Sequence, residues 1–190
     1  MKIKVAAVSY TNTYPFIYGI HRFEDELNLD LKLAYPAQCA DWLVRGEVDM
    51  GLVPVATLLK MPQAKVLDAY CIGADGPVDT VCLYSQVPID EVDQLYLDYQ
   101  SRTSVLLCKI LLKYYLKLNP QLIPAEEGFI DKIEGKTAGL VIGDRAFQLN
   151  DQFPYVYDFA ALWKDFTGLP FVFAAWISPK PLAMDFITRF

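Results

Sequence analysis

The sequence predicts an α/β protein built as two lobes with mixed sheets. Three observations lead to this expectation. Short runs rich in β-branched and aromatic residues alternate with helical patterns, which is typical of a sheet with crossover helices. The chain has 190 residues, of which 54% are hydrophobic and 14% aromatic, so it can bury a sizeable core. The alternating pattern also restarts near the middle of the chain, which indicates a second lobe.

The first half of the chain predicts strands and helices in turn. Residues 3–8 form a first strand, and residues 14–23 form the helix that follows, with Pro15 in its first turn. Residues 29–35 alternate between apolar and polar side chains, as a half-buried strand does. The remaining elements expected here are a helix at 37–45 closed by Gly46, a strand at 48–53, a short helix at 54–60, and extended segments at 66–72 and 78–85.

The second half repeats this pattern. The elements expected there are strands at 95–99, 138–142, 155–159 and 171–177 and helices at 101–118 and 161–166. Residues 179–190 begin another helix, which then stops. We therefore expect the C-terminal helices that would complete the first lobe to be missing from this chain.

Two crossings between the lobes are expected, near residues 85–93 and 168–170. They divide the chain into a discontinuous first lobe, residues 1–88 and 170–190, and a second lobe, residues 89–169. A chain that leaves one lobe, builds another and returns through a strand has the architecture of the type II periplasmic-binding-protein fold, with a hinge at the crossings. We expect a ligand in a cleft between the lobes, at the ends of strands.

The charge of the chain argues against nucleic acid and anionic membranes as partners. The formal net charge is −6 and no Lys/Arg-rich run is present, whereas both partners require concentrated positive charge. The apolar run at residues 3–8 is too short for a signal peptide, and no stretch approaches the length of a membrane span. We therefore expect a cytoplasmic protein whose partner is a small molecule.

The cysteines and the one histidine predict neither a metal site nor a redox pair. Cys39, Cys71, Cys82 and Cys108 are scattered without a CxxC pair, so four buried free thiols are expected. His21 lies in the predicted helix at 14–23 with no catalytic partner nearby in sequence, which favours a structural role. The expected chemistry uses no metal and no cofactor.

Five segments, in order along the chain, carry a recognisable pattern. They are Ser9–Phe16, Gly46–Ala56, Leu97–Val105, Gly139–Ala146 and Asp158–Ala174. Together they resemble the chorismate dehydratase family of the futalosine route to menaquinone. The resemblance implies a lyase that converts chorismate into 3-[(1-carboxyvinyl)oxy]benzoate.

One segment departs from this pattern. Residues 76–81 read Gly-Pro-Val-Asp-Thr-Val, with Thr80 where the family pattern has a serine, so the hydroxyl group is kept. The same segment is similar to the dihydroxynaphthoate synthase of the same route. The Ser-Tyr-x-Asn-x-x-Pro-Phe opening at 9–16 and Ser-Arg-Thr-Ser at 101–104 favour the dehydratase. A non-catalytic solute-binding protein is the other alternative, although that class normally carries an export signal or a lipid-anchor cysteine.

The segment at the start of the helix at 101–118 is a candidate anion site. Ser101, Arg102, Thr103 and Ser104 combine hydroxyl groups with the free N–H groups and the dipole of a helix N-terminus. Arg102 could add a forked donor to a carboxylate. The alternative is an ordinary helix cap followed by a solvated arginine, or an Arg102 that braces the lobe through Asp98.

Two residues are the predicted catalytic donors. Asn12 follows the first strand, together with the predicted substrate contacts Tyr10 and Thr13, and its amide could bind the departing hydroxyl or a carboxylate. An isolated asparagine before a helix more often forms a helix cap or an Asx turn, and both roles can hold together. Thr80 could offer its hydroxyl from the facing strand, although threonine there could simply be a good β-former.

No general base emerges from the sequence. Asp49 and Asp144 are candidates because they lie at predicted strand ends, but Asp144 could pair with Arg145 or cap the next helix. Asp144 is also a predicted substrate contact, and Phe171 a predicted wall of the cleft. Because chorismate carries an enolpyruvyl carboxylate near the ring proton, removal of that proton by the substrate itself is a hypothesis.

Overall fold

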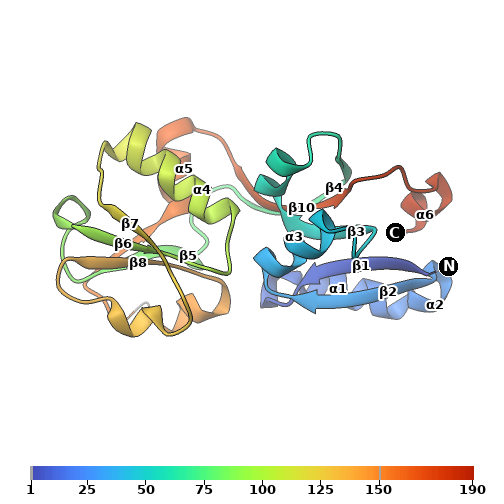
Figure 1. The fold of residues 1–190 in the computed structure, drawn as a ribbon, viewed down its shortest axis with the longest axis horizontal. Coiled ribbons are helices and arrows are strands. Elements are labelled where there is room, and N and C mark those ends of the chain that lie inside the picture. The colour runs from blue at the N-terminus through green and yellow to red at the C-terminus, as the bar shows by residue number, and fades with distance from the viewer. Residues whose placement is uncertain (1, 150) are drawn as a thin grey trace. The chain divides into compact units, whose positions relative to one another are not determined.

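The computed structural model describes residues 2–149 and 151–190 and divides into two compact units. The first unit comprises Met1–Ile72 with Val172–Phe190, and the second is Gly73–Phe171. Each unit has its own five-stranded sheet (Figure 1). Residues 73–88 belong to the second unit, although we predicted them in the first lobe. The reason is that the strand within them hydrogen-bonds to strands of the second sheet.

The sheet of the first unit has the strand order β2-β1-β3-β10-β4. Strand β1 runs parallel to β2 and β3, whereas β10 runs antiparallel to β3. The strands are β1 (Ile3–Val8), β2 (Leu29–Ala34), β3 (Met50–Pro54), β4 (Lys65–Ala74) and β10 (Phe171–Ser178). The return of β10 between β3 and β4 completes a sheet whose other strands come from the start of the chain.

Helices cover both faces of this sheet. On β1, Val5 and Ala7 point toward helices α1 (Tyr14–Arg22), α2 (Glu24–Leu27) and α6 (Met184–Arg189). Ala6 points the other way, toward α3 (Pro36–Val44) and the 3-10 helix η2 (Val55–Lys60). A strand that is buried on both sides must be apolar at consecutive positions, which explains the run Val5 to Val8.

A glycine allows β3 to lie close to β1. A Cβ atom on Gly51 would stand 3.1 Å from the Ala6 carbonyl oxygen. This close approach keeps the parallel pair tight at the centre of the first unit.

The sheet of the second unit has the strand order β7-β6-β8-β5-β9. Strand β6 is parallel to β7 and β8, and β5 is antiparallel to β8 and β9. The strands are β5 (Val81–Ser85), β6 (Gln94–Leu97), β7 (Gln121–Pro124), β8 (Thr137–Ile142) and β9 (Tyr155–Asp158). The carboxyl ends of β6, β8 and β9 therefore lie at the same edge as the amino end of β5, and we call this the second-sheet edge.

Two helices lie side by side on one face of the second sheet (Figure 1). They are α4 (Thr103–Ile110), which continues into the π-helical turn η4 (Leu111–Leu116), and α5 (Phe159–Thr167), which ends at Gly168 with a positive φ. The other face packs on the 3-10 helices η5 (Phe129–Lys132) and η6 (Gly143–Gln148). The remaining short 3-10 helices are η1 (Thr11–Thr13) and η3 (Ile89–Glu91).

Three of the four cysteines are buried as expected, and Cys71 on β4 is exposed. The expectation for Cys71 was wrong because alternate residues of a strand point to opposite faces, and β4 lies at the edge of its sheet. Burial raises the pKa of Cys39, Cys82 and Cys108 to about 12. Within the described residues, no helix has the length and hydropathy needed to cross a bilayer.

These environments predict selective thiol reactivity. At pH 8 a colorimetric disulfide reagent should modify Cys71 quickly, because this thiol is exposed. The other three thiols should react slowly, because they are buried and their raised pKa values keep them protonated. All four thiols should react in guanidinium chloride. Cys71→Ser should abolish the fast phase, and a second fast thiol in the native protein would contradict the burial described here.

Candidate functional site

The second-sheet edge brings together three of the segments singled out in the sequence. Ser101–Ser104 follow β6, Asp144 follows β8 and Thr80 precedes β5. The backbone N–H of Gly143 donates to the carbonyl oxygen of Thr80 at 2.9 Å, which joins two of these segments directly. Sites for ligands in α/β proteins commonly form where the carboxyl ends of strands meet.

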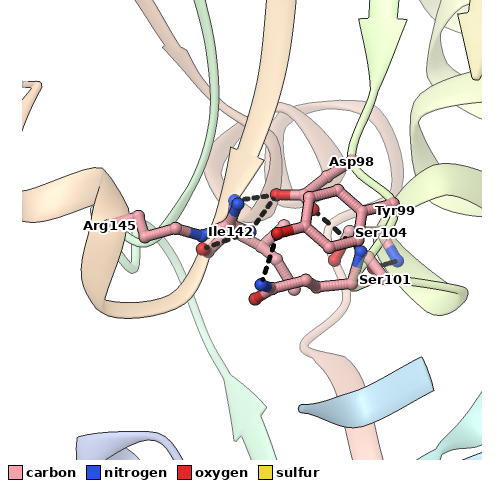
Figure 2. Close-up of polar contacts among 7 residues, drawn as sticks. Asp98, Tyr99, Ser101, Ser104, Ile142 and Arg145 are labelled. Atoms are coloured by element: carbon pink, nitrogen blue, oxygen red, sulfur yellow. Dashed lines mark hydrogen bonds and ion pairs between the residues drawn. The ribbon is translucent and has the colours of Figure 1, made fainter. Parts of the chain in front are cut away.

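The centre of this edge is the carboxylate of Asp98, which directly follows β6. Its side chain is 0% exposed. Oδ1 accepts the backbone N–H of Gln100 at 2.9 Å, and Oδ2 accepts the backbone N–H of Ile142, also at 2.9 Å. One carboxylate therefore joins the turn after β6 to the end of β8 (Figure 2).

An arginine compensates the buried charge of Asp98. Nη2 of Arg145 in η6 donates to Asp98 Oδ2 at 2.6 Å, and the guanidinium lies 5.5 Å from the centre of the Tyr99 ring (Figure 2). The sequence suggested Arg145 as a partner for Asp144 and Arg102 as the brace through Asp98. Arg145 in η6 binds Asp98 at the end of β6 and so braces the second unit from there.

The turn that leads into α4 is built on the same aspartate. The N–H of Ser101 donates to the backbone carbonyl of Asp98 at 3.2 Å, and the Ser101 hydroxyl oxygen accepts the N–H of Ser104 at 3.0 Å. Ser101 therefore has the capping role that was the alternative to ligand binding, and its hydroxyl can still donate its proton. Thr103 and Ser104 are buried, whereas Arg102 is half-buried.

Thr80 lies in a bend, not on a strand as predicted. β5 begins one residue later, at Val81, and the preceding Asp79 has a φ of 59°. This left-handed backbone interrupts the extended segment expected at 78–85. The Thr80 side chain is half-buried beside the second-sheet edge.

Asp158, at the end of β9, accepts hydrogen bonds from the residues that form this bend. Its Oδ2 accepts the backbone N–H groups of Val78 and Asp79, each at 2.7 Å. Its Oδ1 accepts the N–H groups of Ala160 and Ala161 and so caps α5. Our sequence reasoning assigned Asp158 no role; the available signal was an aspartate between a strand and a helix, which predicts the cap but not the contact with residues 78 and 79.

The buried thiol beside Asp158 is not a nucleophile. Cys82 Sγ lies 3.9 Å from Asp158 Oδ2. Burial, and then the negative charge of Asp158, raises the pKa of Cys82 to about 12. The thiol therefore stays protonated at neutral pH. Within the described residues, no group of three or more histidine, cysteine or acidic side chains could hold a metal ion.

The predicted wall residue Phe171 packs against α5. Its ring lies 5.2 Å from the ring of Trp163, centre to centre, in an edge-to-face arrangement. The side chain is half-buried. This contact accounts for Phe171 as a packing residue, and its role as a wall of the substrate site stays a prediction.

In the first unit, the predicted loop after β1 is a compact turn. The N–H of Thr13 donates to the Tyr10 carbonyl at 3.0 Å, and the Thr13 hydroxyl donates to Asn12 Oδ1 at 3.3 Å. Thr13 is fully buried, whereas Asn12 is exposed and Tyr10 is half-buried. Neither η1 nor α1 has a side-chain cap, so the alternative of Asn12 as a helix cap is wrong.

Asp49 lies at the opposite edge of the first sheet from this turn. It precedes β3, and its Oδ2 accepts the N–H of Lys4, near the amino end of β1, at 2.9 Å. Tyr10 and Asn12 follow the carboxyl end of β1. Asp49 is therefore a strand-start contact, and the structure removes it as a candidate base for chemistry near Asn12.

Comparison with known proteins identifies the family. Residues 3–190 match the protein family described as menaquinone biosynthesis, which is nearly the whole chain. The chain belongs to the menaquinone biosynthesis family. Among curated members, the chorismate dehydratase of Thermus thermophilus is 29% identical over 201 aligned residues, covering 90% of this chain and 73% of that protein.

Solved structures show that this family member has the expected fold. The crystal structure of protein AF1704 from Archaeoglobus fulgidus matches with a TM-score of 0.72 at 13% identity, covering 99% of this chain and 72% of that one. The Candida albicans CA3427 gene product, described as having the generic periplasmic binding protein structural fold, matches with a TM-score of 0.53 at 12% identity, covering 93% and 62%. The predicted periplasmic-binding-protein-like fold is thus confirmed.

The ion pair of Asp98 in this menaquinone biosynthesis protein should carry much of the stability of the second unit. Asp98→Ala removes the one carboxylate that accepts from Arg145 and from the backbone N–H groups of Gln100 and Ile142, so we expect a loss of about 3–5 kcal/mol in the free energy of unfolding. Urea unfolding, with hydrogen exchange at β6 and β8 as the local probe, measures it.

The matched control is Asp93→Ala, which removes the exposed pair between Asp93 and Lys136 next to the same strand. An exposed pair contributes about 0–1 kcal/mol. Equal losses from the two variants would show that Asp98 is not the special contact described here.

Proposed function

We propose that this chain is a chorismate dehydratase, a lyase that converts chorismate into 3-[(1-carboxyvinyl)oxy]benzoate in menaquinone biosynthesis. The observation that carries the proposal is the similarity to the Thermus thermophilus chorismate dehydratase over 90% of this chain. A biosynthetic enzyme of this kind acts on a small molecule, and we expect it to act in the cytoplasm.

The reaction removes water from the ring of chorismate. A ring proton leaves as the C–H bond breaks, the C–H electron pair forms the new double bond, and the neighbouring hydroxyl departs with its own bonding pair. Aromatisation supplies the driving force. The protein must therefore bind two carboxylates, hydrogen-bond the departing hydroxyl and provide a modest base.

The second-sheet edge offers donors for one carboxylate. We assign that role to the start of α4, where Ser101 and the half-buried Arg102 precede the helix and Thr103 and Ser104 begin it. Two carboxylates of the second-sheet edge accept donors from the protein itself: Asp98 accepts three N–H groups and Asp158 accepts four. The N–H groups and hydroxyls at the start of α4 can then serve an anion, although the net charge of the protein is −6.

Asn12 in the first unit and Thr80 in the second are the two proposed catalytic donors. Asn12 is exposed on its turn, and the buried Thr13 donates to its Oδ1, which leaves the amide NH₂ group as the proposed donor. We therefore assign Thr13 an orienting role rather than a direct contact. Tyr10 and Asp144 remain proposed substrate contacts.

The positions of three aspartates bear on which group removes the ring proton. Asp49 is at the far edge of its sheet, and the oxygens of Asp98 and Asp158 already accept N–H groups of the protein itself. This arrangement supports the hypothesis that the enolpyruvyl carboxylate of chorismate removes the ring proton.

Incubation with chorismate tests the proposed function. We expect chorismate to disappear and an aromatic product, lighter by one water, to appear by ultraviolet absorption and mass spectrometry. Tight binding without turnover would support a solute-binding protein instead. Turnover of a cyclic futalosine product, but not of chorismate, would support the dihydroxynaphthoate synthase alternative.

Single-turnover kinetics of carboxylate variants tests the substrate as base. Asp79→Asn and Asp144→Asn remove the acidic groups that lie beside Thr80 and after Gly143, and we expect the chemical step to change less than about tenfold in each. Asp49→Asn is the control, because it lies at the far edge of the first sheet. A collapse of about a thousandfold in Asp79→Asn or Asp144→Asn would identify a protein base.

A further inference from the structure

We infer that Asp158 is the positioning residue for Thr80, holding residues 76–80 in the one backbone arrangement that presents the Thr80 hydroxyl. The inference rests on the proposed function for the role of that hydroxyl. Asp158 itself is assigned no contact with substrate. It acts through the backbone of Val78 and Asp79.

The hydrogen bonds to Asp158 are of a strong type. A single carboxylate oxygen, Oδ2, accepts two consecutive backbone N–H groups, from Val78 and Asp79, each at 2.7 Å. Bonds from N–H groups to an ionised acceptor are shorter and about twice as strong as neutral ones. The half-buried position of Asp158 limits competition by water.

These bonds act where the backbone needs support. Asp79 has a φ of 59°, a conformation that a residue with a side chain rarely adopts unless its surroundings hold it. The N–H of this same residue is bound by Asp158. The carbonyl of the next residue, Thr80, accepts the N–H of Gly143. Thr80 is thus fixed from β9 on one side and from η6 on the other.

Helix α5 serves as the platform for this segment. Asp158 Oδ1 caps the helix through Ala160 and Ala161, while Oδ2 holds residues 78 and 79. One turn further along, Lys164 Nζ lies 2.5 Å from Asp75 Oδ1. This ion pair attaches the residue just before the segment to α5, and Asp158 attaches the part of the segment next to Thr80.

The chemistry of the side chain explains why aspartate is needed. Both oxygens accept N–H groups, so asparagine would replace one acceptor by an NH₂ group facing donors. Serine is a good helix cap but is one atom shorter and has a single oxygen, so it keeps the cap and loses the contact with residues 78 and 79. Asp158→Ser therefore separates the two functions of this carboxylate.

A displaced donor should affect the rate more than binding. A hydroxyl that stabilises the departing group acts mainly in the transition state, so moving it lowers kcat with little change in KM. For Asp158→Ser we expect kcat to fall about tenfold to a hundredfold, with KM changed by less than about threefold.

The experiment compares Asp158→Ser, Thr80→Val, their double variant and Ala161→Gly as a control. Ala161→Gly weakens the first turn of α5 without removing an acceptor from residues 78 and 79. Two measurements are made on each purified chain: hydrogen exchange of residues 76–80, and kcat and KM with chorismate.

We expect exchange at residues 78 and 79 to accelerate about tenfold or more in Asp158→Ser, and to stay unchanged in Ala161→Gly. The double variant should be no slower than Thr80→Val, because Asp158 acts through Thr80. Unchanged exchange in Asp158→Ser, or kcat losses that multiply in the double variant, would overturn the inference.

Failure of the proposed function has a different signature. If the wild-type chain does not turn over chorismate, the proposed function is wrong and so is the catalytic purpose of the positioning. Hydrogen exchange would still decide whether Asp158 holds residues 76–80. If the wild-type chain is active and Thr80→Val retains full activity, the inference is overturned, because Thr80 then has no role to be positioned for.

Discussion

The arrangement of the second unit depends on one buried carboxylate, that of Asp98. A charge withdrawn from water is tolerated only when donors satisfy it, and here two backbone N–H groups and the Arg145 guanidinium do so. These donors come from the turn after β6, the end of β8 and η6. Because all three donors bind the same carboxylate, Asp98 fixes the distance between the segments that carry Ser101 and Asp144.

Asp158 repeats the same principle at the other side of this edge. Its two oxygens collect four N–H groups from the segment before β5 and from the start of α5. The carboxylates of Asp98 and Asp158 are thus both held by donors from within the second unit.

Several features could be predicted because they depend on local pattern. The order of strands and helices follows from apolar periodicity, and the turns after β1 and β6 follow from their polar residues. Other predictions were wrong where the decision was not local. β5 pairs with β8 and β9, so residues 73–88 belong to the second unit. Asp49 directly precedes β3 and therefore lies at the edge of the first sheet that holds the amino ends of β1 and β3. The residues next to it in sequence do not show at which edge it lies.

The sequence by itself determined the α/β class, the family pattern and the hydroxyl-rich segments at 9–16, 76–81 and 101–104, because each depends on residues close together in the chain. Only the tertiary structure decided which aspartate serves which purpose. Asp98 and Arg145 are 47 positions apart, and Asp158 and Val78 are 80 apart. A carboxylate acquires its role from the donors that strand pairing brings to it, and strand pairing is a property of the folded sheet.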